Sequence, residues 1–216
     1  MTKNWNYKEL DAFGRIRLSK NFYMREFLHS EIAQIYGLVN APDNPDLAIQ
    51  AGSQLCKKVL EPIAQAWGKV HVRSGYRSPE VNQTGNKNKL NCASNANNAA
   101  AHIWDHKDAS GCCGATACIV IPAYQDYFDK TGDWMSLAWW INHHVPDYFN
   151  MCFFKEQCAF NIRWYGGSDG SQTIKSYLAN PDTGDKTALI NKGREHPLYE
   201  SIPPAKRFAK AAKLIG

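Results

Sequence analysis

A stripe of apolar residues at four-residue spacing constrains the fold of this chain more than any other feature. It begins after Asp46 and consists of Leu55, Val59, Ile63 and Trp67. Residues at this spacing share one helix face, so the segment predicts a long helix whose apolar face lies against a core. Pro62 predicts a kink or a new turn within it, and Gly68 predicts its end, because glycine often follows a helix C-terminus.

Shorter elements surround this helix. Residues 1–20 predict an irregular arm, and residues 19–38 predict a helix. Val70 and Val72 alternate with polar neighbours, which is typical of a half-buried strand, and Ser78 with Pro79 predicts a helix start. A buried strand, an apolar helix, a hairpin of two short strands and a strand with a turn are predicted in segments 114–124, 134–145, 148–167 and 173–189.

This order of helices followed by strands with few crossovers predicts an α+β fold, with a small antiparallel or mixed sheet backed by helices. The chain has 216 residues, 44% of them hydrophobic and 21% charged, which suits one large domain with a core better than two small ones. We expect an N-terminal arm at 1–18, a main domain at 19–180 and a C-terminal extension at 181–216. Within the main domain, Asn-rich and Ala-rich residues 86–113 lack periodicity and predict an inserted loop.

Composition excludes some classes of function. No run of about 18 apolar residues is present, so we expect no membrane span. The segment MTKNWNYKELDAF lacks the apolar stretch of a secretory signal, so we expect a protein that is made and kept in a cytoplasm, or leaves it by another route. Most of the seven cysteines are therefore expected to be thiols. No CxxC pair is present, which argues against a zinc finger.

The net charge of +5 is mildly basic. Its basic residues cluster only near the C-terminus, at Lys206, Arg207, Lys210 and Lys213. This pattern predicts a solvated terminal helix docked by Phe208, Ala212 and Ile215, with contact to a nucleic acid or an acidic surface as the alternative. Nothing else in the sequence suggests nucleic-acid readout. Four aromatic residues could either stack against a sugar on the surface or pack in the core. We favour the core for these residues, which are Trp139, Trp140, Trp164 and Tyr165.

The segment VHVRSGYRSPEVN, residues 70–82, resembles the zinc D-Ala-D-Ala carboxypeptidase family. These are Hedgehog-type peptidases that cut the stem peptides of peptidoglycan, and many phage endolysins are among them. The preceding NFYMREFLHSEIAQIYGL, residues 21–38, is similar to the helix that opens this domain. The resemblance covers about residues 19–165 and implies a carboxypeptidase/Hedgehog-like fold.

In that family two histidines and one aspartate hold zinc, an acidic residue is the general base, and the arginine of SGYRS binds a substrate carboxylate or the oxyanion. Here the resemblance places Arg77 at the arginine and His102 at the first zinc histidine, with His106 as a rival. GATAC, residues 114–118, matches the next motif except that Cys118 stands at the aspartate. Asn161 falls at the second histidine, and Glu156 at the general base.

These departures affect the predicted metal site. A thiolate is a good zinc ligand, whereas a neutral amide is a poor one, so His102 and Cys118 leave only two strong ligands. We therefore expect a degenerate site without zinc. The residues that could rebuild it are Asp105, His106, Asp108, Cys112, Cys113, His143 and His144. The last two histidines are also typical of a helix C-terminus, where the dipole favours imidazolium.

The leading hypothesis is a non-catalytic peptidase-like protein, either a structural component of a phage virion or a cell-wall-binding one. It implies no cofactor, other virion proteins or peptidoglycan as partners, and localisation in the virion after synthesis in the host cytoplasm. The alternative is an active zinc-dependent peptidoglycan peptidase with a rearranged His/Cys/Asp site, in which Arg77 orients the substrate and Glu156 is the base. A third hypothesis is a thiol-reactive protein using Cys112, Cys113 and Cys118.

Overall fold

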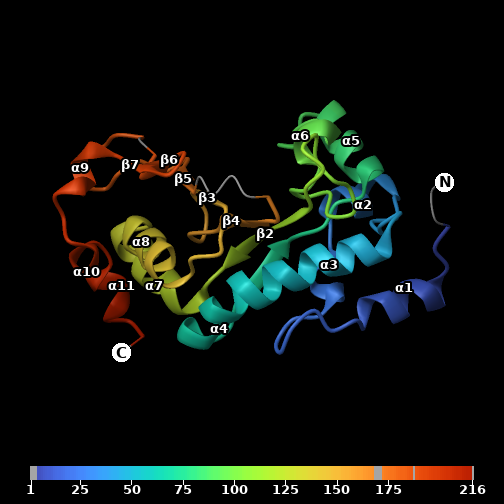
Figure 1. The fold of residues 1–216 in the computed structure, drawn as a ribbon, viewed down its shortest axis with the longest axis horizontal. Coiled ribbons are helices and arrows are strands. Elements are labelled where there is room, and N and C mark those ends of the chain that lie inside the picture. The colour runs from blue at the N-terminus through green and yellow to red at the C-terminus, as the bar shows by residue number, and fades with distance from the viewer. Residues whose placement is uncertain (1–3, 168–171, 187, 216) are drawn as a thin grey trace. The chain divides into compact units, whose positions relative to one another are not determined.

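The computed structural model describes residues 4–167, 172–186 and 188–215. Within these ranges the chain combines helices with a mixed seven-stranded sheet, so the α+β prediction is confirmed (Figure 1). The helices are α1 (Tyr7–Gly14), α2 (Glu31–Tyr36), α3 (Pro45–Leu55), α4 (Glu61–Trp67), α5 (Pro79–Lys87), α6 (Asn95–Asn98), α7 (Pro122–Thr131), α8 (Met135–His144), α9 (Pro197–Glu200), α10 (Pro204–Arg207) and α11 (Ala209–Ala212). The strands are β1 (His71–Ser74), β2 (Gly114–Val120), β3 (Asn150–Phe153), β4 (Phe160–Tyr165), β5 (Thr173–Ser176), β6 (Ile190–Asn191) and β7 (Arg194–Glu195).

The strand order in the sheet is β1-β2-β4-β3-β5-β6-β7. Strands β3 and β5 are parallel, with Met151 opposite Ile174, whereas β5–β6 and β6–β7 are antiparallel. Between β3 and β4 a tight turn is closed by the Phe154 N–H, which donates to the Ala159 carbonyl at 2.7 Å. The strands predicted at 148–167 are confirmed.

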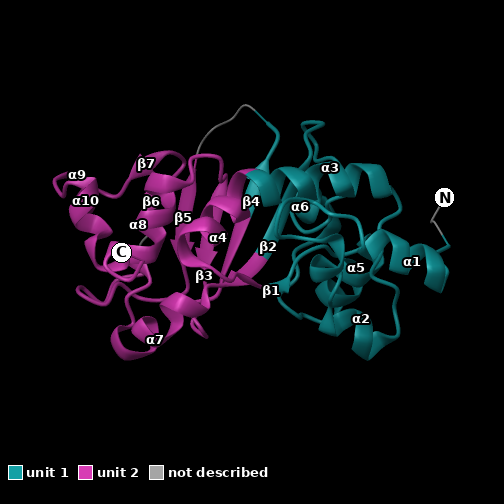
Figure 2. Cartoon of the chain, turned by 90° about the horizontal axis from the view of Figure 1, so that it is seen from below, with its two compact units in different colours: residues 1–57, 72–117, 163–167 teal, residues 58–71, 118–162, 168–216 magenta. Residues whose placement is uncertain are grey.

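The chain divides into two compact units (Figure 2). Unit 1 comprises residues 1–57, 72–117 and 163–167, and unit 2 comprises residues 58–71, 118–162 and 168–216.

The predicted long helix is present but interrupted. A π-turn, Cys56–Leu60, separates α3 from α4, and Pro62 lies in the first turn of α4. Proline has no N–H to donate to the preceding turn, which explains why the regular hydrogen bonding widens just before it. Gly68 ends α4 with a φ of 76°, as predicted.

The prediction for the N-terminal segment is wrong in two respects. The arm contains α1, whose start is secured by a capping box: Asn6 Oδ1 accepts from the Glu9 N–H, and Glu9 Oε2 accepts from the Asn6 N–H, both at 3.0 Å. The continuous helix predicted at 19–38 is instead a 3-10 turn, Met24–Phe27, followed by the short α2. Ser30 caps α2 through its Oγ, which ends the earlier turn and starts a new one.

The core of unit 1 is built around Trp104, whose side chain is fully buried. Its ring centroid lies 5.2 Å from that of Phe27 and 6.2 Å from that of Tyr76. Helix α3 approaches the indole closely at Gly52, where an added Cβ would lie 2.7 Å from Trp104 Cζ3 and 3.2 Å from a Leu18 methyl carbon. The absence of a side chain at this position therefore permits the packing.

The segment predicted as an inserted loop is ordered by its asparagines. Asn82, fully buried on α5, donates to the Ala93 carbonyl at 3.0 Å and to Asn95 Oδ1 at 2.8 Å. Asn98 donates to Asn82 Oδ1 at 2.6 Å. These amides satisfy one another and hold α6 against α5, so a composition typical of a loop here forms a polar network.

Unit 2 packs its helices and strands around α8, whose first seven residues are all buried. Ring centroids of Trp134 and Phe153 lie 5.3 Å apart, and Phe153 stacks on Phe160 at 4.5 Å. Trp139, Trp140 and Trp164 are buried, as predicted, whereas Tyr165 is only half-buried. No helix in the described ranges is both long and apolar enough to cross a bilayer.

The C-terminal segment differs from the single solvated helix that was predicted. It forms α10 and α11, which break at Phe208 and lie against α8 (Figure 1). Ala211 is fully buried, and the side chain of Arg207 is 6% exposed. The Arg207 guanidinium lies over the Trp139 ring at 4.6 Å and forms an ion pair with Glu195 at 2.8 Å, so this cation is a packing residue rather than a solvated one.

Substitution of Gly52 tests the packing against Trp104. In an exposed helix Gly→Ala stabilises by about 1 kcal/mol, but here the added methyl meets the indole. We expect Gly52→Ala to lower the free energy of unfolding by about 1–2 kcal/mol, measured by urea denaturation. Ser53→Ala, one residue along, is the control and should change stability by less than about 0.5 kcal/mol; equal effects would refute the close approach.

Candidate functional site

His102 is a buried, neutral histidine in unit 1. The residue comes shortly after α6 in the chain, and its Nδ1 lies 2.8 Å from the Gly75 carbonyl oxygen. Because a carbonyl oxygen only accepts, Nδ1 carries the hydrogen and Nε2 keeps its lone pair. Burial lowers the pKa of His102 to about 3; the positive charges of Arg77 and Arg163 also lower it, and the hydrogen bond to Gly75 opposes the change.

Arg77 contacts His102 through its backbone, and its positive charge lowers the pKa of that histidine. The Arg77 N–H donates to the His102 carbonyl at 2.8 Å, and its guanidinium Nη1 donates to Cys92 Sγ at 3.2 Å. Arg163, at the unit 1 end of β4, donates from Nε to the Ala100 carbonyl at 3.0 Å and lies over the Tyr165 ring at 4.8 Å. Two guanidinium groups therefore create a positive potential around the neutral imidazole.

Asp105 is buried in unit 1 and both of its carboxylate oxygens are engaged. Its Oδ1 accepts from the Tyr76 hydroxyl at 3.0 Å, while Oδ2 accepts from the backbone N–H groups of Asp43 at 2.8 Å and Asn44 at 3.3 Å. The carboxylate thus ties the segment before α3 to the segment after β1. Burial, followed by the charge and hydrogen bond of Asp105, raises the pKa of Tyr76, so the phenol stays protonated and donates.

Asp108 organises the turn that leads to the vicinal cysteines. Its Oδ1 accepts from the N–H groups of Ser110 at 2.9 Å and Cys112 at 3.0 Å, and its Oδ2 accepts from the Tyr165 hydroxyl at 2.7 Å. Burial raises the pKa of Asp108, but these three hydrogen bonds and the charge of Arg163 outweigh it, so the net pKa is lowered. Asp108 is therefore an ionised turn residue.

The remaining predicted residues are His106 in unit 1 and three residues of unit 2. His106 is exposed, and its carbonyl accepts from the Ala100 N–H. Cys118, on β2, packs with Val120 and Ala159 in an apolar cluster of unit 2. Glu156 is exposed in the β3–β4 turn, and half-buried Asn161 lies on β4, both in unit 2.

The other candidate ligands are accounted for by local contacts. Cys112 and Cys113 are half-buried, and none of the seven cysteines, all of which lie in described ranges, forms a disulfide. His143 and His144 end α8, as predicted. The His144 ring stacks on Trp140 at 4.5 Å, and both histidines pack on Phe208. They contribute to the helix interface of unit 2.

These residues do not fit a zinc ion. A structural or catalytic zinc takes at least three protein donors, and in the part of the chain that the structure describes no group of three His, Cys, Asp or Glu side chains converges. His102 has a suitable tautomer, but both oxygens of Asp105 bind the chain itself. In unit 1, Arg77 and Arg163 place positive charge near the neutral His102.

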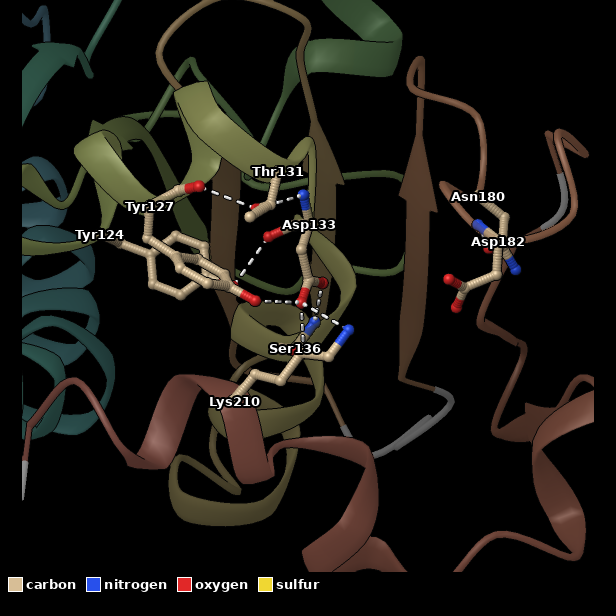
Figure 3. Close-up of polar contacts among 8 residues, drawn as sticks. All are labelled: Tyr124, Tyr127, Thr131, Asp133, Ser136, Asn180, Asp182 and Lys210. Carbon is tan, nitrogen blue, oxygen red and sulfur yellow. Dashed lines mark hydrogen bonds and ion pairs between the residues drawn. The ribbon is translucent and has the colours of Figure 1, made fainter.

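A second polar site, which is not among the residues predicted from the sequence, lies in unit 2 and is centred on Asp133. Figure 3 shows Tyr127, Ser136 and Lys210 gathered at its carboxylate. Asp133 is 5% exposed; its Oδ1 accepts from the Ser136 N–H at 3.0 Å, and its Oδ2 accepts from Ser136 Oγ at 2.7 Å and the Tyr127 hydroxyl at 3.1 Å. Lys210 Nζ lies 3.8 Å from the same oxygen.

Part of this second site has a signal in the sequence. Asp133 stands three residues before Ser136, at the start of an apolar helix, which is a capping arrangement. A negative charge there also interacts favourably with the helix dipole. The contact between Lys210 and Asp133 has no local signal in the sequence. Lys210 lies 77 positions further along the chain, and the contact depends on the packing of α11 against α8.

Replacement of Asp105 tests its role as a structural carboxylate. In Asp105→Asn one carboxylate oxygen is replaced by an N–H₂ group, which cannot accept the hydrogen bonds that the chain donates to Asp105. We therefore expect this substitution to lower the free energy of unfolding by about 2–4 kcal/mol. Chemical denaturation followed by circular dichroism measures this. Asp126→Asn, at an exposed position on α7, is the matched control and should be nearly neutral; similar values for both would contradict the assignment.

The buried histidine predicts a pH dependence of stability. His102 has a usual pKa of 6.5 when unfolded and about 3 when folded, so the unfolded state binds more protons between these values. Stability is therefore present above pH 6.5 and is lost as the pH falls towards 3, by up to about 1.4 kcal/mol per pH unit. The free energy of unfolding, measured with urea between pH 7 and 4, should fall less steeply with decreasing pH in His102→Gln than in the wild type.

His106→Gln is the control for this experiment, because His106 is exposed. The free energy of unfolding of His106→Gln should fall with decreasing pH as steeply as that of the wild type. A wild-type slope equal to that of His102→Gln would show that His102 protonates without cost in the fold.

No protein-family model, curated protein or solved structure matches this chain. The resemblance to the zinc carboxypeptidases therefore rests on sequence motifs alone, in residues 21–38, 70–82 and 114–118.

Proposed function

We propose that this protein is a non-catalytic, peptidase-like component of a phage particle that binds the peptidoglycan of the host cell wall without cutting it. The proposal joins the resemblance of residues 70–82 to the carboxypeptidase family with the geometry of unit 1. Its partners are the stem peptides of the wall and, within the particle, other virion proteins. On this proposal the fold is of the carboxypeptidase/Hedgehog type.

The engagement of Asp105 carries the proposal. It is the buried carboxylate closest in sequence to His102, and it is one of the residues that could rebuild a zinc site there. Both of its oxygens accept hydrogen bonds from the chain, at 2.8 to 3.3 Å. Release of this carboxylate would leave a buried hydroxyl and two N–H groups without acceptors, which is costly.

The arginines support binding of a carboxylated ligand. Arg77 is half-buried beside His102, and one of its N–H donors is used on Cys92. A guanidinium presents five donors in a planar fork that suits a carboxylate. The terminal carboxylate of a stem peptide is a ligand of this chemistry. The neutral His102, whose carbonyl accepts from the Arg77 N–H, keeps a lone pair on Nε2.

Binding to intact cell-wall sacculi tests the proposal. The full chain should co-sediment with purified sacculi and release no amino acid from them. Arg77→Ala should weaken the binding about tenfold, as expected when a charge-assisted hydrogen bond is removed. Arg73→Ala, an exposed arginine on β1 in the same unit, is the matched control and should bind as wild type does. Absence of binding, or equal loss in both variants, would overturn the proposal.

An active zinc-dependent peptidase with a rearranged His/Cys/Asp site is the second candidate, and one observation favours it. His102 donates from Nδ1 to a backbone carbonyl, the arrangement that holds a zinc-binding histidine with Nε2 towards the metal. Elemental analysis of the purified chain separates the two candidates. About one equivalent of zinc, lost in His102→Gln and Cys118→Ser and accompanied by chelator-sensitive hydrolysis, would replace the first proposal with this one.

A further inference from the structure

Unit 2 contains a cavity of about 170 Å³ beside the Asp133 network. Its walls come from the start of α8, the turn at 181–182, α9 and the segment carrying α10 and α11. Pockets for drug-sized ligands span roughly 300–1,000 Å³. A cavity of this size therefore suits a ligand as small as a single amino acid.

The charges that line the cavity have opposite signs. Lys206, Arg207 and Lys210 supply positive charge, and Asp133 and Asp182 supply negative charge. Figure 3 shows Asp182 on a segment separate from the Asp133 network, across from Ser136 and Lys210. A ligand in this cavity thus meets a cationic side and an anionic side within a small volume.

Two of these charges are not used by the fold. Arg207 is committed to Glu195, to the Ile202 carbonyl and to the Trp139 ring. Asp133 and Lys210 face each other at 3.8 Å. By contrast, within the described ranges neither the Lys206 ammonium nor the Asp182 carboxylate makes a hydrogen bond or an ion pair. Their charges are available to a ligand.

The lining excludes other ligand classes. A sugar stacks on an open aromatic face, but Trp139 is 3% exposed and Arg207 lies over its ring at 4.6 Å. A metal cation would be repelled by three basic side chains, and a simple anion would leave the Asp182 carboxylate without a partner. The apolar wall formed by Met135, Pro181 and Ile202 accommodates a short hydrocarbon chain.

We propose that this cavity binds a free α-amino acid with a small or apolar side chain. Lys206 and Lys210 hold its carboxylate, Asp182 holds its ammonium group, and Met135 with Ile202 contacts its side chain. Asp133 acts through Lys210 as a positioning residue, because its carboxylate directs that ammonium group at the cavity wall. This site lies wholly in unit 2 and goes beyond the proposed wall binding by unit 1.

Isothermal titration of the full chain with glycine, L-alanine and L-leucine tests the proposal. At least one of the three should bind at one site per chain with a dissociation constant in the millimolar range or below. For L-leucine, the half-charged analogues 4-methylpentanoate and 3-methylbutylamine should each bind at least about tenfold more weakly, because each lacks one charge-assisted contact. Failure of all three amino acids to bind would overturn the proposal, as would equal binding of either analogue.

Substitutions of cavity residues test whether the amino acid binds in this cavity. Lys206→Gln and Asp182→Asn should each weaken amino-acid binding about tenfold. Both side chains are exposed and unused by the fold, so the melting temperature without ligand should stay unchanged. Lys155→Gln and Asp126→Asn are matched controls at exposed positions of unit 2 outside the cavity, and they should bind as wild type does. Equal losses in the cavity and control variants would overturn the assignment.

The two proposals fail separately. Arg77→Ala in unit 1 should leave amino-acid titrations unchanged, and Lys206→Gln should leave sedimentation with sacculi unchanged. Loss of amino-acid binding in Arg77→Ala would overturn the assignment of this ligand to the unit 2 cavity.

Discussion

The carboxylate of Asp105 joins three parts of unit 1 that are distant in sequence. It accepts from the N–H groups of Asp43 and Asn44 just before α3, and from the hydroxyl of Tyr76 just after β1. Tyr76 in turn borders the Trp104 ring, and its neighbour Arg77 donates to the His102 carbonyl. The position of the candidate site therefore depends on a buried carboxylate whose removal would leave several donors unsatisfied.

Unit 2 uses a buried carboxylate in a related way. Asp133 caps the start of α8 through Ser136, and it also faces Lys210 on α11. Burial and the charge of Asp133 raise the pKa of Tyr127, whose hydroxyl donates to this carboxylate. One side chain thus links a local cap to the docking of the C-terminal segment, and the cavity lies beside that link.

The two units show different balances of charge, and these suit different ligands. In unit 1, Arg77 and Arg163 surround a neutral histidine, and the nearby carboxylates are held by the chain. That environment favours a negative group. In unit 2 an unused carboxylate and an unused ammonium group share one cavity, which favours a ligand that carries both charges. The proposals for the two units follow from this difference.

Local patterns in the sequence predicted several elements. The four-residue stripe predicted the long helix, Ser78 and Pro79 predicted the start of α5, and Gly68 predicted the end of α4. The strand predicted at 114–124 is β2, which ends earlier, at Val120, and the apolar helix predicted at 134–145 is α8. These features depend on neighbours within one or two turns, which the sequence displays directly. The capping box of Asn6 and Glu9 is equally local, so the start of α1 is also displayed in the sequence, although this segment is predicted as an irregular arm.

The sites depend on contacts that no local pattern reveals. The sequence by itself determined which residue types could act, including His102, Arg77 and Asp105. Only the tertiary structure decided that Asp105 is held by residues about 60 positions away, that His102 is neutral, and that Lys210 meets Asp133. The reason is physical: hydrogen bonding, burial and Coulomb energy depend on distance in space, and a folded chain brings together charges whose separation in sequence carries no information about that distance.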